Sequence, residues 1–112
     1  MTDVIQFTRN DDSIWQMTLK KANGSAYPLT NCTFTLRVKT NRTDPDSATL
    51  ITKTTGDGIS VGDATGIVTI TFVPTDTKDL VVDKVYDYDV ELTTTTLLKF
   101  TILRSHFKVL QD

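Results

Sequence analysis

The residues able to do nucleophilic, acid–base or metal chemistry are few in this chain. It has one histidine, His106, one cysteine, Cys32, and carboxylates that are nearly all aspartates in turns. His106 and Cys32 could form a nucleophilic pair only if folding joined them, and a lone cysteine inside an amphipathic strand is usually a small core residue. We therefore expect no catalytic residues, and an intracellular enzyme is the least favoured class of function.

Aspartates could bind calcium, which prefers hard oxygen ligands. Five lie close in sequence: Asp76, Asp79, Asp83, Asp87 and Asp89. They form no Asp-x-Asp-x-Asp-Gly loop, and residues 87, 89 and 91 would follow one another about 7 Å apart on one strand face. A row of carboxylates on a solvated face also keeps a β-protein soluble and discourages edge pairing. We therefore predict no metal site and no cofactor.

Composition points to one folded, strand-rich domain covering residues 1–112. The chain has 22 Thr, 10 Val and 7 Ile, which favour strands, against 4 Ala and 1 Glu, which favour helices. Its 38% hydrophobic and 23% charged residues are typical of a globular protein rather than a disordered one. An all-helical fold is therefore excluded.

Charge and hydropathy argue against nucleic-acid and membrane partners. The net charge is −2 and no basic cluster exceeds the pair Lys20-Lys21, whereas binders of nucleic acid or anionic lipid carry a basic patch. The chain has no apolar stretch of membrane-spanning length and no secretory signal at its start. We expect the mature chain to begin near Met1 in a cytoplasm and, because Cys32 is alone, to form no intrachain disulfide.

Apolar and polar residues alternate along most of the chain, which is typical of strands with one buried face. We expect strands near residues 5–7, 13–21, 32–40, 48–54, 59–61, 67–73 and 85–92, and a last strand or strand pair over 97–110. A tight turn at Asn23-Gly24 should end the second strand. The segment 41–47 is predicted to be a polar surface loop, and 74–80 a helix of one or two turns at most, capped by Thr75 and with Leu80 facing inward.

The last predicted strand contains a break in its alternation. Leu98, Phe100 and Ile102 alternate before Arg104-Ser105 interrupts the phase. A β-bulge or bend at that point would return the following apolar residues to a core. The aromatic residues other than Tyr27 lie in phase with the strands, so core packing accounts for them.

About seven to nine short strands joined by short turns indicate an all-β fold, a two-sheet antiparallel β-sandwich. A small β-barrel is the alternative. The order of segments DDSIWQMTLKKANGSAYPLTNCTFTLRVK, GDGISVGDATGIVTITFVPTDTKDL and VYDYDVEL resembles the small immunoglobulin-like β-sandwich domains of tailed bacteriophages and prophages, in particular the N-terminal domain of the baseplate upper protein. The likeness covers roughly residues 5–110.

The resemblance implies a non-enzymatic structural module of a phage tail or baseplate, made in the bacterial cytoplasm and carried in the virion. Its partners would be other tail or baseplate proteins, and we expect a homo-oligomer with edge strands and the loop 41–47 as contacts. The alternative is a host-receptor or carbohydrate-binding module in which loops at one end, including 41–47 and 62–66, read a glycan.

Overall fold

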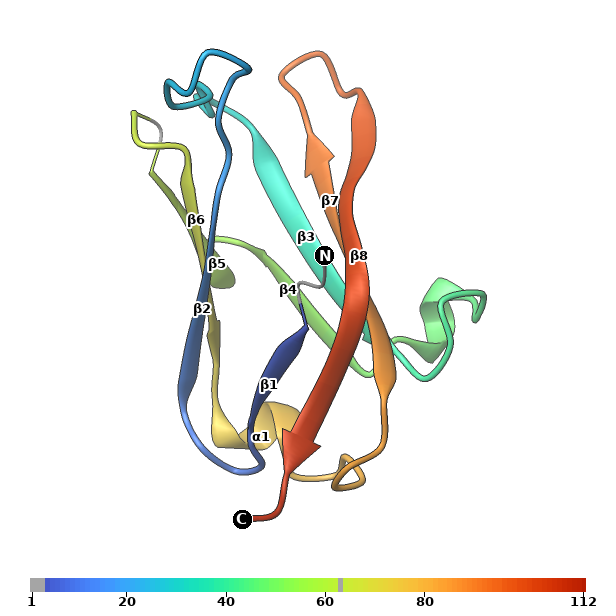
Figure 1. Ribbon diagram of the computed structural model, residues 1–112. Coiled ribbons are helices and arrows are strands. Elements are labelled where there is room, and N and C mark those ends of the chain that lie inside the picture. The colour runs from blue at the N-terminus through green and yellow to red at the C-terminus, as the bar shows by residue number, and fades with distance from the viewer. Residues whose placement is uncertain (1–3, 63) are drawn as a thin grey trace.

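A computed structural model describes residues 4–62 and 64–112 (Figure 1). The expected chain start at Met1 and the first residue of the turn at 63–66 lie outside the described residues. The strands are β1 (Ile5–Thr8), β2 (Ser13–Thr18), β3 (Thr33–Lys39), β4 (Ile51–Thr55), β5 (Gly58–Gly62), β6 (Ile67–Phe72), β7 (Tyr86–Thr93) and β8 (Lys99–Leu110). The chain also forms a 3-10 turn, η1 (Asp46–Ala48), and one helical turn, α1 (Pro74–Thr77).

The strands belong to one hydrogen-bonded sheet in the order β1-β8-β7-β3-β4-β5-β6-β2. The sheet curls until its end strands β1 and β2 lie on the same side, so it nearly closes into a barrel (Figure 1). The all-β prediction is confirmed, and the single sheet supports the small-barrel alternative rather than the two-sheet sandwich. The antiparallel prediction needs correction, because β1 pairs with β8 and β4 with β5 in parallel.

The predicted alternation is confirmed where the sheet wraps the core. The inward residues are almost fully buried on β3 (Phe34, Leu36, Val38), β6 (Val68, Ile70, Phe72) and β7 (Tyr86, Tyr88, Val90). In the fourth predicted strand, residues 48–54, Ile51 is buried and its neighbour Leu50 is exposed. Phe7, Phe72 and Phe107 form an aromatic cluster with ring centroids 5.3–5.5 Å apart.

The last strand differs from its prediction in where it meets the core. β8 is continuous through Arg104-Ser105, and its bulge lies earlier, at Ile102, because Val90 pairs with Leu103 while the next residue of β7 pairs with Thr101. Phe107 and Val109 are fully buried, as expected. Leu98 and Phe100 are instead half exposed, since the β7–β8 hairpin extends past the end of the core.

The predicted turn at Asn23-Gly24 closes only one bridge, between Lys20 and Ala26. Gly24 takes the expected positive φ of 88°, but β2 then pairs with β6 and not with the strand that follows it in sequence. A hairpin turn therefore forms here without a hairpin of two full strands.

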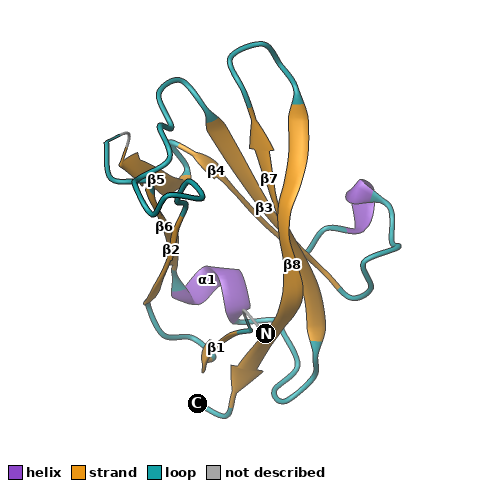
Figure 2. Cartoon of the chain, turned by 45° about the horizontal axis from the view of Figure 1, so that its top comes forward, coloured by secondary structure: helices purple, strands orange, loops and turns teal. Residues whose placement is uncertain are grey.

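The helical turn α1 follows β6 and lies at the end of the sheet where β1 and the C-terminus meet (Figure 2). Its cap is not Thr75: the Asp76 carboxylate accepts the Val73 N–H at 2.8 Å. Leu80 is buried as expected. The Tyr86 hydroxyl accepts the Val81 N–H at 2.9 Å and so ties the start of β7 to the connection before it.

Candidate interaction site

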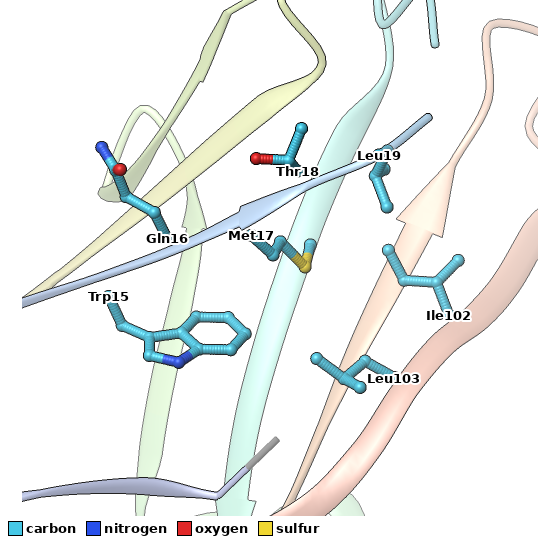
Figure 3. A pocket seen from close by; sticks show the side chains of 7 residues that line it. All are labelled: Trp15, Gln16, Met17, Thr18, Leu19, Ile102 and Leu103. Carbon is cyan, nitrogen blue, oxygen red and sulfur yellow. The ribbon is translucent and has the colours of Figure 1, made fainter. Parts of the chain in front are cut away.

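A groove lies between β2 and β8, where the curled sheet stays open. It is a hollow of about 490 Å³ lined by Trp15, Gln16, Met17, Thr18, Leu19, Ile102 and Leu103. In Figure 3, Trp15, Met17 and Leu19 point from β2 toward Ile102 and Leu103, and Gln16 and Thr18 point away. The side chains that face into the groove are all apolar.

The pairing of β1 explains why the groove is open. β1 is only four residues long and covers β8 along Phe107–Leu110 alone. After it the chain turns at Asn10, which has a positive φ of 67°, and crosses to the opposite end of the sheet order as β2. No other strand of the described chain lies beside the earlier part of β8 on this side or beside β2 on its outer side.

A second hollow of about 340 Å³ extends the groove toward the β7–β8 hairpin. It shares Leu19 and Ile102 with the first and is also lined by Lys20, Tyr27, Leu92 and Phe100. Apolar side chains stand out from the same hairpin, with Leu97 79% and Leu98 57% exposed. An apolar patch of this kind at the rim of a groove is typical of a contact surface for another molecule.

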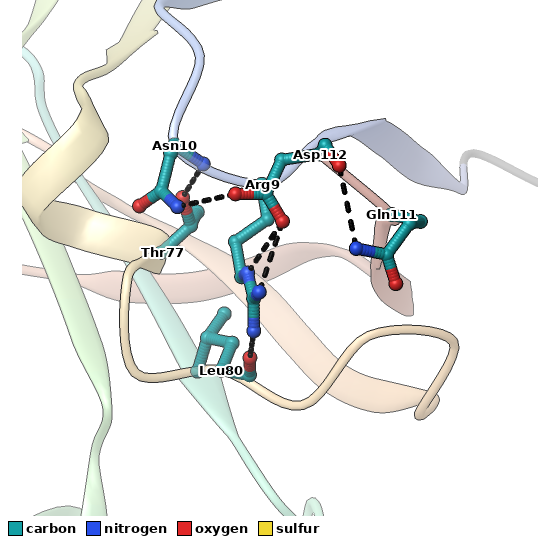
Figure 4. Close-up of polar contacts among 6 residues, drawn as sticks. All are labelled: Arg9, Asn10, Thr77, Leu80, Gln111 and Asp112. Carbon is teal, nitrogen blue, oxygen red and sulfur yellow. Dashed lines mark hydrogen bonds and ion pairs between the residues drawn. The ribbon is translucent and has the colours of Figure 1, made fainter.

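A cluster of polar contacts lies beside β1, at the end of the groove where the C-terminus lies (Figure 4). Arg9 binds the Asp112 carboxylate at 2.9 Å and the Leu80 carbonyl at 3.2 Å. Asn10 donates its side-chain amide to Asp112 at 2.8 Å and its backbone N–H to Thr77 at 3.0 Å. The hydrogen bond from Asn10, with those from the Asp112 backbone and Arg9, lowers the pKa of the Asp112 carboxyl.

The outer face of β3, β7 and β8 is a ladder of alternating charges. Asp89 lies opposite Arg37 on one side and Arg104 on the other. Burial raises the pKa of the Asp89 carboxyl, although Lys39 and the two arginines act in the opposite direction. Cross-strand pairs of opposite charge stabilise a sheet, so this face has a structural explanation.

The loop 41–47 is tied to that face. Lys39 donates to the Asp46 carboxylate at 2.7 Å and to the Asp44 carbonyl at 3.1 Å, and its hydrogen bond lowers the pKa of Asp46. The Asp87 carboxylate accepts the Arg42 N–H at 2.9 Å. The loop lies where β3 ends and β7 begins, at the end of the sheet opposite to that where β5 ends and β6 begins, so the two loops considered for glycan binding do not share an end (Figure 1).

The structure does not bring Cys32 and His106 together. Cys32 precedes Thr33, which pairs with Thr93, whereas His106 pairs with Asp87 six residues away, about 20 Å along the strands. The His106 ring instead contacts the Asp87 carboxylate at 3.1 Å on an exposed face.

The aspartates considered for calcium are also dispersed. Asp76 pairs with Lys53, Asp87 contacts His106, and Asp89 lies between two arginines. Within residues 4–62 and 64–112, no group of three or more His, Cys, Asp or Glu is placed to hold a metal ion.

Sequence reasoning missed one buried ion pair inside the sheet. Lys53 shares the inward face of β4 with Ile51, and its ammonium lies 2.7 Å from the Asp76 carboxylate. The sequence did carry a signal for it, because the two-residue period of a strand places Lys53 on the same face as Ile51. Because the lysine is satisfied by Asp76 and stacks near the Phe72 ring, it fastens α1 to the core.

No protein-family model matches the chain, and no curated protein matches it significantly. Among the helices of the described residues, none has the length and apolar character needed to cross a bilayer.

Proposed function

We propose that this chain is a non-enzymatic structural module that acts through protein–protein contacts in the assembly of a phage or prophage tail or baseplate. The observation that carries the proposal is the apolar groove between β2 and β8, bounded by strand edges that pair with no strand in the described part of the chain. Apolar lining beside free backbone groups suits an extended polypeptide or another sheet edge better than a small polar substrate.

The finer part of the proposal is an immunoglobulin-like arrangement of two layers, β1-β8-β7-β3-β4 and β5-β6-β2. Two features support it. Only two residue pairs, Thr54 with Gly58 and Thr55 with Ile59, link β4 to β5. The Tyr86 hydroxyl bound to the Val81 amide also matches the tyrosine corner found in many immunoglobulin-like domains.

The phage assignment rests on the resemblance of the sequence segments, and gene neighbourhood tests it at little cost. We expect tail, baseplate or holin genes beside the coding sequence. A neighbourhood consisting of a metabolic operon would contradict the assignment.

The contact role is tested by binding to the tail and baseplate proteins encoded beside this chain, with biolayer interferometry as the readout. We expect at least one to bind, and Phe100→Asp to weaken that binding about tenfold or more, because aromatic residues in contact patches often dominate affinity. Val85→Asp is the matched control, since Val85 is 52% exposed and Phe100 51%, and Val85 lies outside the groove.

Equal binding by wild type and Phe100→Asp would exclude the groove as the contact surface. If no neighbouring protein bound and light scattering showed a strict monomer at every concentration, the assembly role itself would be wrong.

A further inference from the structure

The free edge of β2 (Ser13–Thr18) exposes backbone groups ready for pairing. The N–H of Leu19 donates to the Gly66 carbonyl at 2.8 Å on the β6 side. Because backbone groups alternate in direction along a strand, Ile14, Gln16 and Thr18 direct theirs to the opposite, free side. The hairpin that follows does not cover this side, since Tyr27 N–H reaches the Leu19 carbonyl on the β6 side.

This edge lacks the features that usually prevent edge pairing. The segment SIWQMT contains no charge and no proline, and the pairing of β2 with β6 is regular through six residues without a bulge. Charged side chains, prolines and bulges are the common protections of a sheet edge. Ile14, which is 68% exposed, even presents an apolar side chain there.

The charges flanking β2 are self-complementary. The segment reads Asp11-Asp12, seven uncharged residues, then Lys20-Lys21. If two copies pair antiparallel about Gln16, Asp12 of each copy lies opposite Lys20 of the other, and Asp11 and Lys21 lie just beyond this pair. All four side chains are exposed and make no hydrogen bond or ion pair within the part of the chain that the structure describes.

The register is determined by two independent conditions. The free backbone groups belong to even-numbered residues, so even residues must face even residues across the edge. Among the registers that satisfy this, the one centred on Gln16 pairs Asp12 of each copy with Lys20 of the other. Shifting the centre to Trp15 or Met17 places Asp12 opposite Thr18 or Ala22 and removes these charge pairs.

We propose that a second copy of this chain binds the free edge of β2 with its own β2, antiparallel and centred on Gln16, to form a symmetric dimer with a continuous sheet. Each copy offers the same surface, as a two-fold interface requires. Ile14 then packs beside Thr18 of the second copy on the outer face, and Trp15 beside Met17 of the second copy at the groove. The inference rests on the proposed assembly function and names one partner for its surface.

The test measures the dimer dissociation constant of the full chain by analytical ultracentrifugation. Gln16→Pro removes an N–H on the free side of β2 and leaves the β2–β6 pairing intact. We therefore expect the dimer dissociation constant to rise about tenfold or more. Gln16→Ala is the matched control: it removes the side-chain hydrogen bond to Thr69 but keeps the N–H, so it should weaken the dimer much less than Gln16→Pro does.

A charge exchange tests the register without proline. Asp12→Lys should weaken the dimer, and Asp12→Lys combined with Lys20→Asp should restore it, because cross-strand charges again become opposite. A monomer at all concentrations, an unaffected Gln16→Pro dimer, or no restoration by the double variant would overturn the proposal. A monomer that still binds a neighbouring tail protein would overturn the dimer alone, whereas failure of both kinds of binding would overturn the proposed function as well.

Discussion

Tyr86→Phe removes one hydroxyl and leaves the ring in place. The ring is buried, 3% exposed, and Lys84 lies over its face with the ammonium 5.2 Å from the ring centroid. The substitution keeps that packing. What it removes is the acceptor for the Val81 N–H at 2.9 Å, the hydrogen bond that fixes the connection between α1 and β7.

The expected loss of stability is about 1–2 kcal/mol. A hydrogen bond contributes about 1 kcal/mol net, and a partly buried donor left without its acceptor adds to the loss. Unfolding entropy of about 2.1 cal/mol/K per residue, taken over 112 residues, converts each kcal/mol into a fall of about 4 °C in Tm. The variant should therefore melt about 4–8 °C below the wild type.

Thermal melts followed by circular dichroism and urea titrations of the same samples measure this effect. Tyr27→Phe is the control, because Tyr27 is half exposed and its hydroxyl makes no hydrogen bond within the described residues. It should melt with the wild type. If Tyr86→Phe also melted with the wild type, the corner would not stabilise the fold and its use as support for an immunoglobulin-like arrangement would fail.

Three further substitutions test the core, the polar cluster beside β1 and a turn. Phe107→Ala should cost about 3–5 kcal/mol in urea titrations, because the ring is fully buried in the aromatic cluster; a loss below about 1 kcal/mol would contradict that packing. The hydrogen bond from Asn10 lowers the pKa of Asp112 in the folded state. The ionised Asp112 carboxylate therefore stabilises the fold at pH values above its unfolded-state pKa, and this stabilisation is lost as the pH falls through its folded-state pKa. Asp112→Asn should thus be less stable than wild type at neutral pH and equal to it in strong acid, and a pH-independent difference would refute the assignment. Gly66→Ala should destabilise more than Gly24→Ala, since both glycines have positive φ but only at Gly66 would a Cβ collide with a backbone carbonyl; equal losses in thermal melts would show that φ alone matters.

Alternation predicted the inward residues wherever the sheet covers one face of a strand. Phe34, Val68 and Val90 are buried as their two-residue period indicates. Strand pairing was not predictable in the same way. The turn at Asn23-Gly24 depends only on neighbouring residues, and it forms as predicted. The partner of β2, however, is β6, some fifty residues away in sequence, and no local signal encodes that choice.

The same limit explains the error in β8. Period two assigns Leu98 and Phe100 to one face of the strand, and it contains no information on whether other elements reach far enough to cover that face. The hairpin extends past the core, so both side chains are half exposed. The bulge was expected from the broken phase at Arg104-Ser105, but Ile102 is the residue that lacks a direct partner on β7.

The uncovered residues gather in one place, and that gives the candidate surface a basis apart from the family resemblance. Trp15, Met17, Leu19, Phe100 and Ile102 lie in phase with the core yet line the groove, and none is fully buried. Their side chains face inward because the strand period directs them there; they stay accessible because, among the described residues, β1 covers β8 along Phe107–Leu110 alone. Sequences that are locally consistent with their fold usually depart from that consistency where function requires it. Such a departure, beside a regular and uncharged strand edge, is the reason we propose that another chain supplies the missing cover.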